Sequence, residues 1–280
     1  MIVSLVTYRH RPEDIRPVVD AVKASANVEK FIVVDNTVVN RGFGAAHNIA
    51  IRQAMESGAK YHAIVNPDIS FAPGTLEAIE AFMEQNPDVG LVMPKTVNPD
   101  GSLQYNCKLV PTPFDLFARR FLPASWIKRH NDRFILRNAD YTKVMDIPYL
   151  CGCFLVFRLA CLREVGLFDE RFFMYPEDID MTRRVYVSRW RSVYFPGATV
   201  VHAHVAASYR NLRMLGVHIW NLMKYFNKWG WFFDAERRRI NGEIENRVHK
   251  TVKGADDRFE DEEGRQGEED LREDHGGRRS

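Results

Sequence analysis

The chain has 280 residues, 45% hydrophobic and 12% aromatic, which is enough apolar material to bury a full core in one or two domains. These values exclude a mini-protein and a mainly disordered chain. The net charge of +2 conceals a division, because residues 254–280 carry −6 and the preceding residues carry +8. A moderately basic body without a long Lys/Arg run favours anionic ligands such as nucleotide diphosphates, or an anionic membrane surface, over nucleic acid.

The cysteines and the N-terminus indicate a reducing compartment. The four cysteines are Cys107, Cys151, Cys153 and Cys161, and they lack paired CxxC spacing. We therefore expect four free thiols, and we expect neither a zinc ribbon nor a disulfide framework. The apolar run at residues 2–6 is too short for a signal peptide, and no later stretch reaches about 18 uncharged apolar residues. We therefore expect a cytoplasmic protein, either free or resting on the inner face of the membrane.

Short apolar runs alternate with helical patterns over the first hundred residues. We expect strands at 2–6, 31–34, 63–65 and 89–93. Helices are expected from Pro12, where two acids follow the proline, and at 44–57 and 74–85. Apolar strands that alternate with helices predict an α/β fold with a Rossmann-like, mostly parallel sheet flanked by helices.

The second half of the chain has less regular patterns. A turn is expected at 98–101, followed by an irregular insertion near the site at 111–145. Further elements are expected as a strand at 149–157, a helix at 159–165 and two short strands at 192–195 and 199–202.

Residues 210–250 are helical in pattern and rich in aromatic and basic side chains. Two interpretations stay open: a helical hairpin packed on the sheet domain with its turn at Gly230, or amphipathic helices at a bilayer interface. From Gly254 onward 16 of 27 residues are charged, so we expect a disordered tail without a catalytic role. The expected organisation is a domain at 1–209, with halves at about 1–100 and 101–209, then helices at 210–250 and a tail at 251–280.

Polar residues follow the predicted strands, at the edge where such sheets bind ligands. Thr7 and Asp35 end the first two strands, and a carboxylate such as Asp35 can accept hydrogen bonds from a ribose or a base. Glycines at 42 and 44 open the next helix, whose free N–H groups could face an anion. The alternative for this segment is a plain strand-to-helix turn.

Two further segments could hold a metal ion. Asn66-Pro67-Asp68 presents one carboxylate on a stiff loop, and Mg²⁺ or Mn²⁺ on a diphosphate needs only one or two protein carboxylates. The alternative for Asp68 is a turn former or helix cap. His202 and His204, two apart on a strand, could both point at a metal or a phosphate, although a structural pair has the same pattern.

Three carboxylates at 177, 178 and 180 begin a helix, where the helix dipole alone explains their presence. The apolar residues 172–175 would desolvate the first carboxylates and raise their pKa towards the range of a general base. Glu177 and Asp178 are therefore candidate catalytic residues.

Taken in chain order, these motifs resemble the family 2 glycosyltransferases of the GT-A fold, especially their bacterial rhamnosyltransferase-like branch, over about residues 1–235. The motifs are Asp35, NRGFGAAHN at 40–48, Asn66-Pro67-Asp68, GLFDE at 166–170, FFMYPEDID at 172–180, His202 and KYFNKWG at 224–230.

The resemblance implies roles for the donor site. Thr7 and Asp35 would hold the nucleoside, and the turn with Gly42, Gly44 and Asn48 would lie against the donor.

Asn66 and Asp68 would take the place of the DxD motif, with Asn66 in place of its first aspartate and Asp68 binding Mg²⁺ or Mn²⁺ and the diphosphate. Asp178 matches the general base, and His202, or else His204, matches the histidine of the metal or diphosphate site.

The function that the resemblance implies is inverting transfer of L-rhamnose from dTDP-L-rhamnose to a lipid-linked glycan in cell-surface polysaccharide synthesis. The C-terminal helices would then form a membrane-surface platform. The alternatives are a UDP- or GDP-sugar donor for the same reaction, or a nucleotide-binding protein that has lost turnover. A sugar-phosphate nucleotidylyltransferase is disfavoured because no Gly-rich basic loop stands at the N-terminus.

Overall fold

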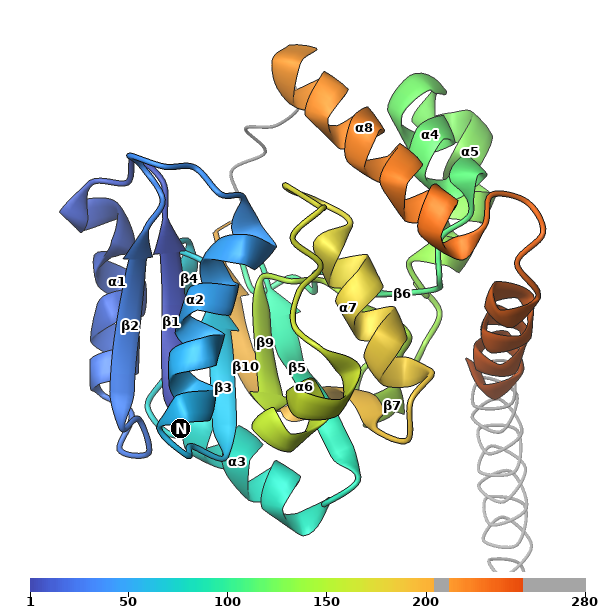
Figure 1. The fold of residues 1–280 in the computed structure, drawn as a ribbon. Coiled ribbons are helices and arrows are strands. Elements are labelled where there is room, and N and C mark those ends of the chain that lie inside the picture. The colour runs from blue at the N-terminus through green and yellow to red at the C-terminus, as the bar shows by residue number, and fades with distance from the viewer. Residues whose placement is uncertain (204–211, 249–280) are drawn as a thin grey trace, which may run out of the picture.

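The computed structural model describes residues 1–203 and 212–248 (Figure 1). In chain order its elements are β1 (Ile2–Thr7), α1 (Pro12–Lys23), β2 (Lys30–Asp35), α2 (Phe43–Glu56), β3 (Tyr61–Val65), β4 (Ile69–Phe71), α3 (Thr75–Gln85), β5 (Val89–Val97), β6 (Cys107–Lys108), α4 (Pro113–Phe121), α5 (Ala124–Phe134), β7 (Met145–Asp146), β8 (Tyr149–Leu150), β9 (Phe154–Arg158), α6 (Leu159–Val165), α7 (Glu177–Tyr186), β10 (Arg191–His202) and α8 (Leu212–Trp229). Residues 235–248 form a further helix.

One central sheet contains eight of the strands in the described part of the chain. Its order is β2-β1-β3-β9-β5-β10-β4, with β7 beside β10. β1, β2, β3, β5 and β10 run in one direction, whereas β9, β4 and β7 run antiparallel to their neighbours. The expected mostly parallel α/β sheet is confirmed. Because the parallel strands end at one edge, the polar residues that follow them are brought to the same side of the molecule.

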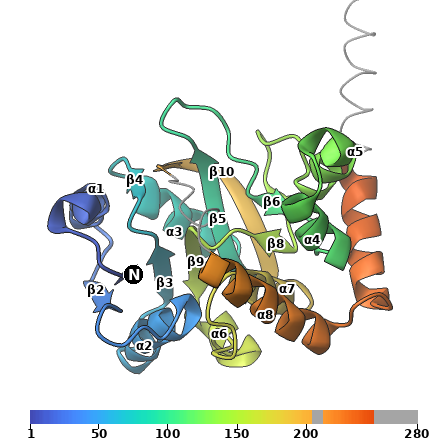
Figure 2. The same ribbon diagram turned by 90° about the horizontal axis from the view of Figure 1, so that it is seen from above.

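Helices cover both faces of this sheet, as the view from above shows (Figure 2). α2, α6 and α7 lie on one face, where Ile51, Leu162 and Ile179 join one buried apolar cluster. α1 and α3 lie on the other face, where Val18 and Ile79 join a second cluster. β3 is buried along its whole length between these layers, which explains its uninterrupted run of mainly apolar residues.

The segment at 111–145, expected to be irregular, is instead largely helical and forms α4 and α5. Thr112 and Asp115 cap the start of α4: the Thr112 N–H donates to Asp115 Oδ2 at 2.7 Å, and the Asp115 N–H donates to Thr112 Oγ1 at 3.2 Å. Pro123 separates the segment into two helices that are too short to show a long apolar repeat.

Three expected strands also differ in their extent. The strand expected at 149–157 divides into β8, which pairs with β6, and β9, which enters the main sheet. The two short strands expected at 192–202 are one strand, β10, with a register shift between Phe195 and Thr199. The turn at 98–101 is confirmed by the hydrogen bond from the Gly101 N–H to the Asn98 carbonyl, at 2.9 Å.

The C-terminal part contains two helices joined by a turn at the expected Gly230, and the second helix runs away from the end of α8 (Figures 1 and 2). Gly230 has a φ of +99° between α8 and the helix at 235–248, a conformation that favours glycine. Tyr225 and Phe226 of α8 are fully buried in the same cluster as α6 and α7. In the described ranges, no helix combines the length and the apolar character that crossing a bilayer needs. His204 and the expected tail at 251–280 lie outside the described residues.

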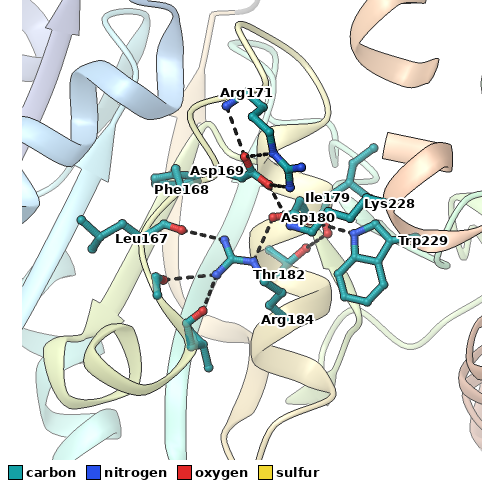
Figure 3. A network of polar contacts seen from close by, with 12 residues as sticks. Leu167, Phe168, Asp169, Arg171, Ile179, Asp180, Thr182, Arg184, Lys228 and Trp229 are labelled. Carbon is teal, nitrogen blue, oxygen red and sulfur yellow. Dashed lines mark hydrogen bonds and ion pairs between the residues drawn. The ribbon is translucent and has the colours of Figure 1, made fainter. Parts of the chain in front are cut away.

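A buried carboxylate joins α7 to α8 (Figure 3). The fully buried Asp180 accepts hydrogen bonds from Arg184 Nε at 2.9 Å and from Trp229 Nε1 at 2.8 Å, and it pairs with Lys228 Nζ at 2.6 Å. Lys228 also contacts Asp169 Oδ2, at 2.9 Å, in the loop before α7. Because a buried charge is tolerated only with such partners, Asp180 holds three segments together and has no free carboxylate edge for catalysis.

A second buried ion pair joins α7 to the segment between the two C-terminal helices. Both terminal nitrogens of Arg183 on α7 contact the carboxylate of Asp234, at 2.8 and 2.9 Å, and both side chains are almost fully buried. The Arg183 guanidinium also lies over the Trp229 ring, 4.1 Å from its centroid. The two C-terminal helices are therefore an integral part of this fold.

Two histidines are buried without charge beneath the site. Ser4 Oγ lies 2.8 Å from His47 Nδ1 on α2 and 2.8 Å from His62 Nε2 on β3. Burial lowers the pKa of each imidazole to about 3, and the nearby His62 adds to the effect on His47. Unfolding exposes both rings to water, where their pKa is near 6.5, so the unfolded chain binds more protons between pH 3 and pH 6.5.

We therefore expect stability to fall as the pH is lowered through 6.5, in part because of these two rings. The His62→Gln variant, which cannot gain this charge, should lose about 2 kcal/mol less than the native chain between pH 7 and pH 5. Urea unfolding at the two pH values measures the difference. Equal losses in both chains would show that His62 does not titrate on unfolding.

Candidate active site

The ends of β1 and β2 lie side by side at the polar edge of the sheet. Thr7 pairs with Asp35 in the parallel register, and the Asn36 N–H donates to the Thr7 carbonyl at 2.8 Å. Asp35 is exposed and accepts the Thr37 N–H at 2.9 Å, and the hydrogen bonds from Thr37 lower the pKa of this carboxyl. An ionised, open carboxylate is the group that a ribose or a base N–H could reach.

The glycine turn after β2 docks on the loop before α7. Gly42 has a φ of +85°, and a Cβ there would lie 2.0 Å from the Phe173 carbonyl oxygen. The Phe43 N–H donates to the same oxygen at 3.0 Å. A Cβ on Gly44 would lie 2.8 Å from Phe168 Cβ. Both glycines therefore permit close backbone packing between α2 and this loop.

Asn48 belongs to the same contact. Its fully buried amide donates to the Phe168 carbonyl at 2.9 Å, and its Oδ1 accepts the Phe168 N–H at 3.0 Å. Its Nδ2 also donates to Glu170 Oε1 at 2.9 Å. The residues of the NRGFGAAHN motif thus hold the segment that leads into α7, and their expected contact with a donor stays a prediction.

Asp68 and His202 are brought together from segments far apart in the chain. His202 on β10 pairs with Ile69 on β4, and the Ala203 N–H donates to the Asp68 carbonyl at 2.9 Å. His202 Nε2 lies 3.3 Å from Asp68 Oδ1. The histidine is almost buried, whereas the side chain of Asp68 is 37% exposed.

Gln104 holds the other side of the imidazole. Its Oε1 lies 2.9 Å from His202 Nδ1, and its Nε2 donates to the His202 carbonyl at 2.8 Å. The sequence alone does not indicate a role for Gln104. A glutamine shortly after a turn has no local signal of such a role, because its partner stands 98 positions later.

One oxygen and one imidazole nitrogen are suitable ligands for Mn²⁺ or Mg²⁺ when phosphate oxygens and water complete the coordination. The pair of Asp68 and His202 therefore fits a cation that also binds a diphosphate. In residues 1–203 and 212–248, no group of three or more His, Cys, Asp or Glu side chains is arranged to hold a metal without such a partner.

The loop at 151–153 connects this pair to Asp178. The Asn66 N–H, two residues before Asp68, donates to the Cys153 carbonyl at 2.9 Å. The Gly152 N–H donates to Asp178 Oδ2 at 3.0 Å. A Cβ on Gly152 would lie 3.1 Å from Asp178 Cβ, so a small residue is needed for this approach. The same short loop therefore contacts the segments that carry both carboxylates.

Asp178 has the properties that a general base needs near neutral pH. Burial raises its pKa to about 6, while the backbone N–H of Gly152, the charge of Lys108 and the backbone N–H of Ile179 act in the opposite direction. A carboxyl with this pKa is mostly ionised at pH 7 and still accepts a proton readily. The sequence alone does not indicate Gly152 or Lys108, because Gly152 reaches α7 through the placement of the loop before β9 and Lys108 through the pairing of β6 with β8.

Glu177, the other candidate, has a different environment. It is almost fully buried, and its Oε2 has no hydrogen-bond partner in the part of the chain that the structure describes. Burial, together with the adjacent Asp178 charge, raises the pKa of Glu177 well above its usual range. Burial therefore favours the protonated form of Glu177.

No family model matches the sequence. Two curated proteins of Mycobacterium tuberculosis, from strains CDC 1551 / Oshkosh and ATCC 25618 / H37Rv, are each 26% identical to the chain over 238 residues. The alignment covers 78% of this chain and 75% of theirs, and both are named N-acetylglucosaminyl-diphospho-decaprenol L-rhamnosyltransferase.

Two solved structures share the fold. GalNAc-T7 with UDP, GalNAc and Mn²⁺ matches with a TM-score of 0.52 and 12% identity, over 72% of this chain and 43% of its own. The mannosyltransferase PcManGT of Pyrobaculum calidifontis with GDP-Man and Mn²⁺ matches with a TM-score of 0.51 and 17% identity, over 81% of this chain and 63% of its own. The chain thus spans less than two thirds of either solved chain. It has the GT-A glycosyltransferase fold, and the resemblance of its sequence to the rhamnosyltransferase-like enzymes of this fold is confirmed.

Proposed function

We propose that the protein is an inverting, divalent-cation-dependent glycosyltransferase that moves a sugar from a nucleotide donor to a lipid-linked glycan. The observation that carries the proposal is the double contact of the loop at 151–153. This loop bonds to the segment of Asp68 through Asn66 and directly to Asp178. A diphosphate bound near Asp68 and an acceptor hydroxyl near Asp178 would therefore meet at one edge of the sheet.

In this proposal Thr7 and Asp35 bind the nucleoside, and Gly42, Gly44 and Asn48 shape the wall of the donor site. Asp68 and His202 hold Mg²⁺ or Mn²⁺, with Asn66 on the same loop. A cation bound there would neutralise the charge that develops on the leaving nucleotide diphosphate. His204 remains an alternative metal ligand from sequence alone.

Asp178 acts as the general base. Its carboxylate takes the proton of the acceptor hydroxyl as the oxygen forms a bond to C1 of the sugar. The bond from C1 to the phosphate oxygen breaks, and its electron pair leaves with the nucleotide diphosphate. Because the oxygen attacks the face opposite the leaving group, this single displacement inverts the anomeric configuration.

The similarity to the mycobacterial proteins supports L-rhamnose as the sugar and a diphospholipid-linked N-acetylglucosamine as the kind of acceptor. We infer dTDP-L-rhamnose as the donor and a step of cell-surface polysaccharide synthesis as the reaction. The solved structures contain UDP and GDP-Man, so a UDP- or GDP-sugar is the alternative donor.

A lipid-linked acceptor requires access to a membrane surface, and exposed aromatic side chains support such contact. Trp126 on α5 is 79% exposed, Trp220 on α8 is 59% exposed, and Phe233 after α8 is 92% exposed. Lys224 lies 5.8 Å from the centre of the Trp220 ring, so a cation accompanies an exposed aromatic ring. Aromatic and basic side chains together favour the interface of an anionic bilayer. We therefore propose peripheral binding at the inner face of the membrane.

A panel of nucleotide sugars tests the proposed donor. With Mn²⁺ or Mg²⁺ present, we expect the protein to consume dTDP-L-rhamnose faster than UDP- or GDP-hexoses, as measured by release of the nucleotide diphosphate. Faster release from a UDP- or GDP-sugar would replace the donor but keep the reaction. No release from any donor, with or without a lipid-linked acceptor, would support a nucleotide-binding protein without turnover.

The Asp178→Asn variant should bind nucleotide as the native chain does and lose about 100-fold or more of its transfer rate, the range of general-base catalysis. The native rate should rise with pH through about 6, because only ionised Asp178 accepts a proton. Glu177→Gln is the matched comparison: it removes the neighbouring carboxyl and leaves Asp178 in place, so the acid limb should stay near pH 6. Unchanged transfer in Asp178→Asn would remove this residue from the role.

Vesicle flotation tests the membrane contact. The intact chain should float with vesicles of phosphatidylcholine and phosphatidylglycerol, and a Phe232→Ser/Phe233→Ser variant should float less, because both rings are exposed. Val38→Ser is the control, since Val38 is 92% exposed in the loop between β2 and α2. Equal flotation of all three chains would place the contact elsewhere, and no flotation of the native chain would contradict membrane binding.

A further inference from the structure

The side chain of Gln104 forms hydrogen bonds with His202 at two points. Its Nε2 lies 2.8 Å from the His202 carbonyl oxygen, and its Oε1 lies 2.9 Å from His202 Nδ1. A glutamine amide and a histidine thus form a closed pair of hydrogen bonds, one to the backbone and one to the ring. Neither the sequence motifs nor the comparisons assign a role to this glutamine.

The backbone contact determines the orientation of the amide and, through it, the tautomer of the ring. A carbonyl oxygen only accepts, so the Gln104 atom that faces it must be the NH₂ group. The opposite amide atom is then the oxygen, which only accepts. His202 Nδ1 must therefore carry a hydrogen, and in the neutral ring Nε2 carries the lone pair.

This tautomer directs the lone pair of Nε2 towards Asp68 Oδ1, 3.3 Å away. Two acceptors at this separation repel each other unless a cation or a proton is shared between them. A ring that donates its far N–H to a fixed oxygen is also the arrangement found behind metal-binding histidines, where it sets the tautomer and raises the basicity of the ligand.

Gln104 is itself held rigidly. Its N–H donates to the Thr96 carbonyl at 2.9 Å, and its Nε2 also donates to Asn98 Oδ1 at 2.7 Å. Asn98 begins the turn at 98–101, which closes with the bridge between Val97 and Leu103. The turn therefore supports the glutamine, and the glutamine supports the histidine.

We propose that Gln104 is a positioning residue for the cation site: it locks His202 in the Nδ1–H tautomer with Nε2 aimed at Asp68. The inference rests on the divalent-cation binding of the proposed function. It concerns a residue that acts through His202 and does not itself touch the cation or the substrate.

Mn²⁺ binding tests this role without an activity assay. In the presence of dTDP, the free Mn²⁺ signal in electron paramagnetic resonance gives the affinity of each variant. Gln104→Leu should weaken Mn²⁺ binding about 10- to 100-fold, the effect typical of a lost partner behind a metal ligand. Gln104→Glu keeps an acceptor for Nδ1–H and should lose less. Gln85→Leu, the same change at an exposed position at the end of α3, should bind as the native chain does.

A double-mutant cycle separates this role from a general structural one. If Gln104 acts through His202, Gln104→Leu should have no further effect on Mn²⁺ affinity in a His202→Ala background. Ring ¹⁵N nuclear magnetic resonance without metal should show the Nδ1–H tautomer of His202 in the native chain and its loss in Gln104→Leu. The His202→Ala spectrum assigns the signal.

Native Mn²⁺ affinity in a folded Gln104→Leu variant, or an Nε2–H tautomer in the native chain, would overturn the inference. Equal weakening by Gln104→Leu in both backgrounds would do the same. If Gln104→Leu does not fold, the native tautomer decides the question. Absence of Mn²⁺ binding by the native chain with dTDP would instead contradict the proposed function. The tautomer measurement would still test the hydrogen bond between Gln104 and the His202 ring.

Discussion

The position of β9 is the constraint on which the site depends. This strand runs antiparallel between β3 and β5, so its start lies at the edge where those two strands end. The loop at 151–153 enters the strand at that edge and bonds to Asn66 on one side and to Asp178 on the other. A parallel β9 would bring its opposite end there, and the two candidate carboxylates would lose their common neighbour.

The carboxylates at the start of α7 show how environment assigns different roles to similar residues. Asp178 accepts backbone N–H groups and its pKa is raised to about 6, whereas burial and the adjacent Asp178 charge raise the pKa of Glu177 well above its usual range. Asp180 is surrounded by Arg184, Lys228 and Trp229 and serves to anchor α8. The helix dipole favours all three positions equally, so the difference arises from their neighbours.

The glycine turn after β2 connects the nucleotide-binding half to α7. Gly42 and Gly44 leave no room for side chains, and Asn48 bonds to both backbone groups of Phe168. The motif therefore positions the segment that leads into α7, while its contact with a donor stays a prediction from the resemblance.

The sequence by itself determined the alternating strands and helices, the polar ends of β1, β2 and β3, and the identity of Asp68, Asp178 and His202 as candidates, because these depend on local spacing and on short motifs. Only the tertiary structure decided which distant segments meet. Gln104 reaches His202 across 98 positions, Gly152 reaches Asp178 through the placement of β9, and Asp180 is an anchor because α8 returns to α7. Such contacts depend on chain reversals and pairing registers that no local pattern encodes. α4 and α5 also lack a clear local signal, because Pro123 separates them into two helices too short to show a long apolar repeat.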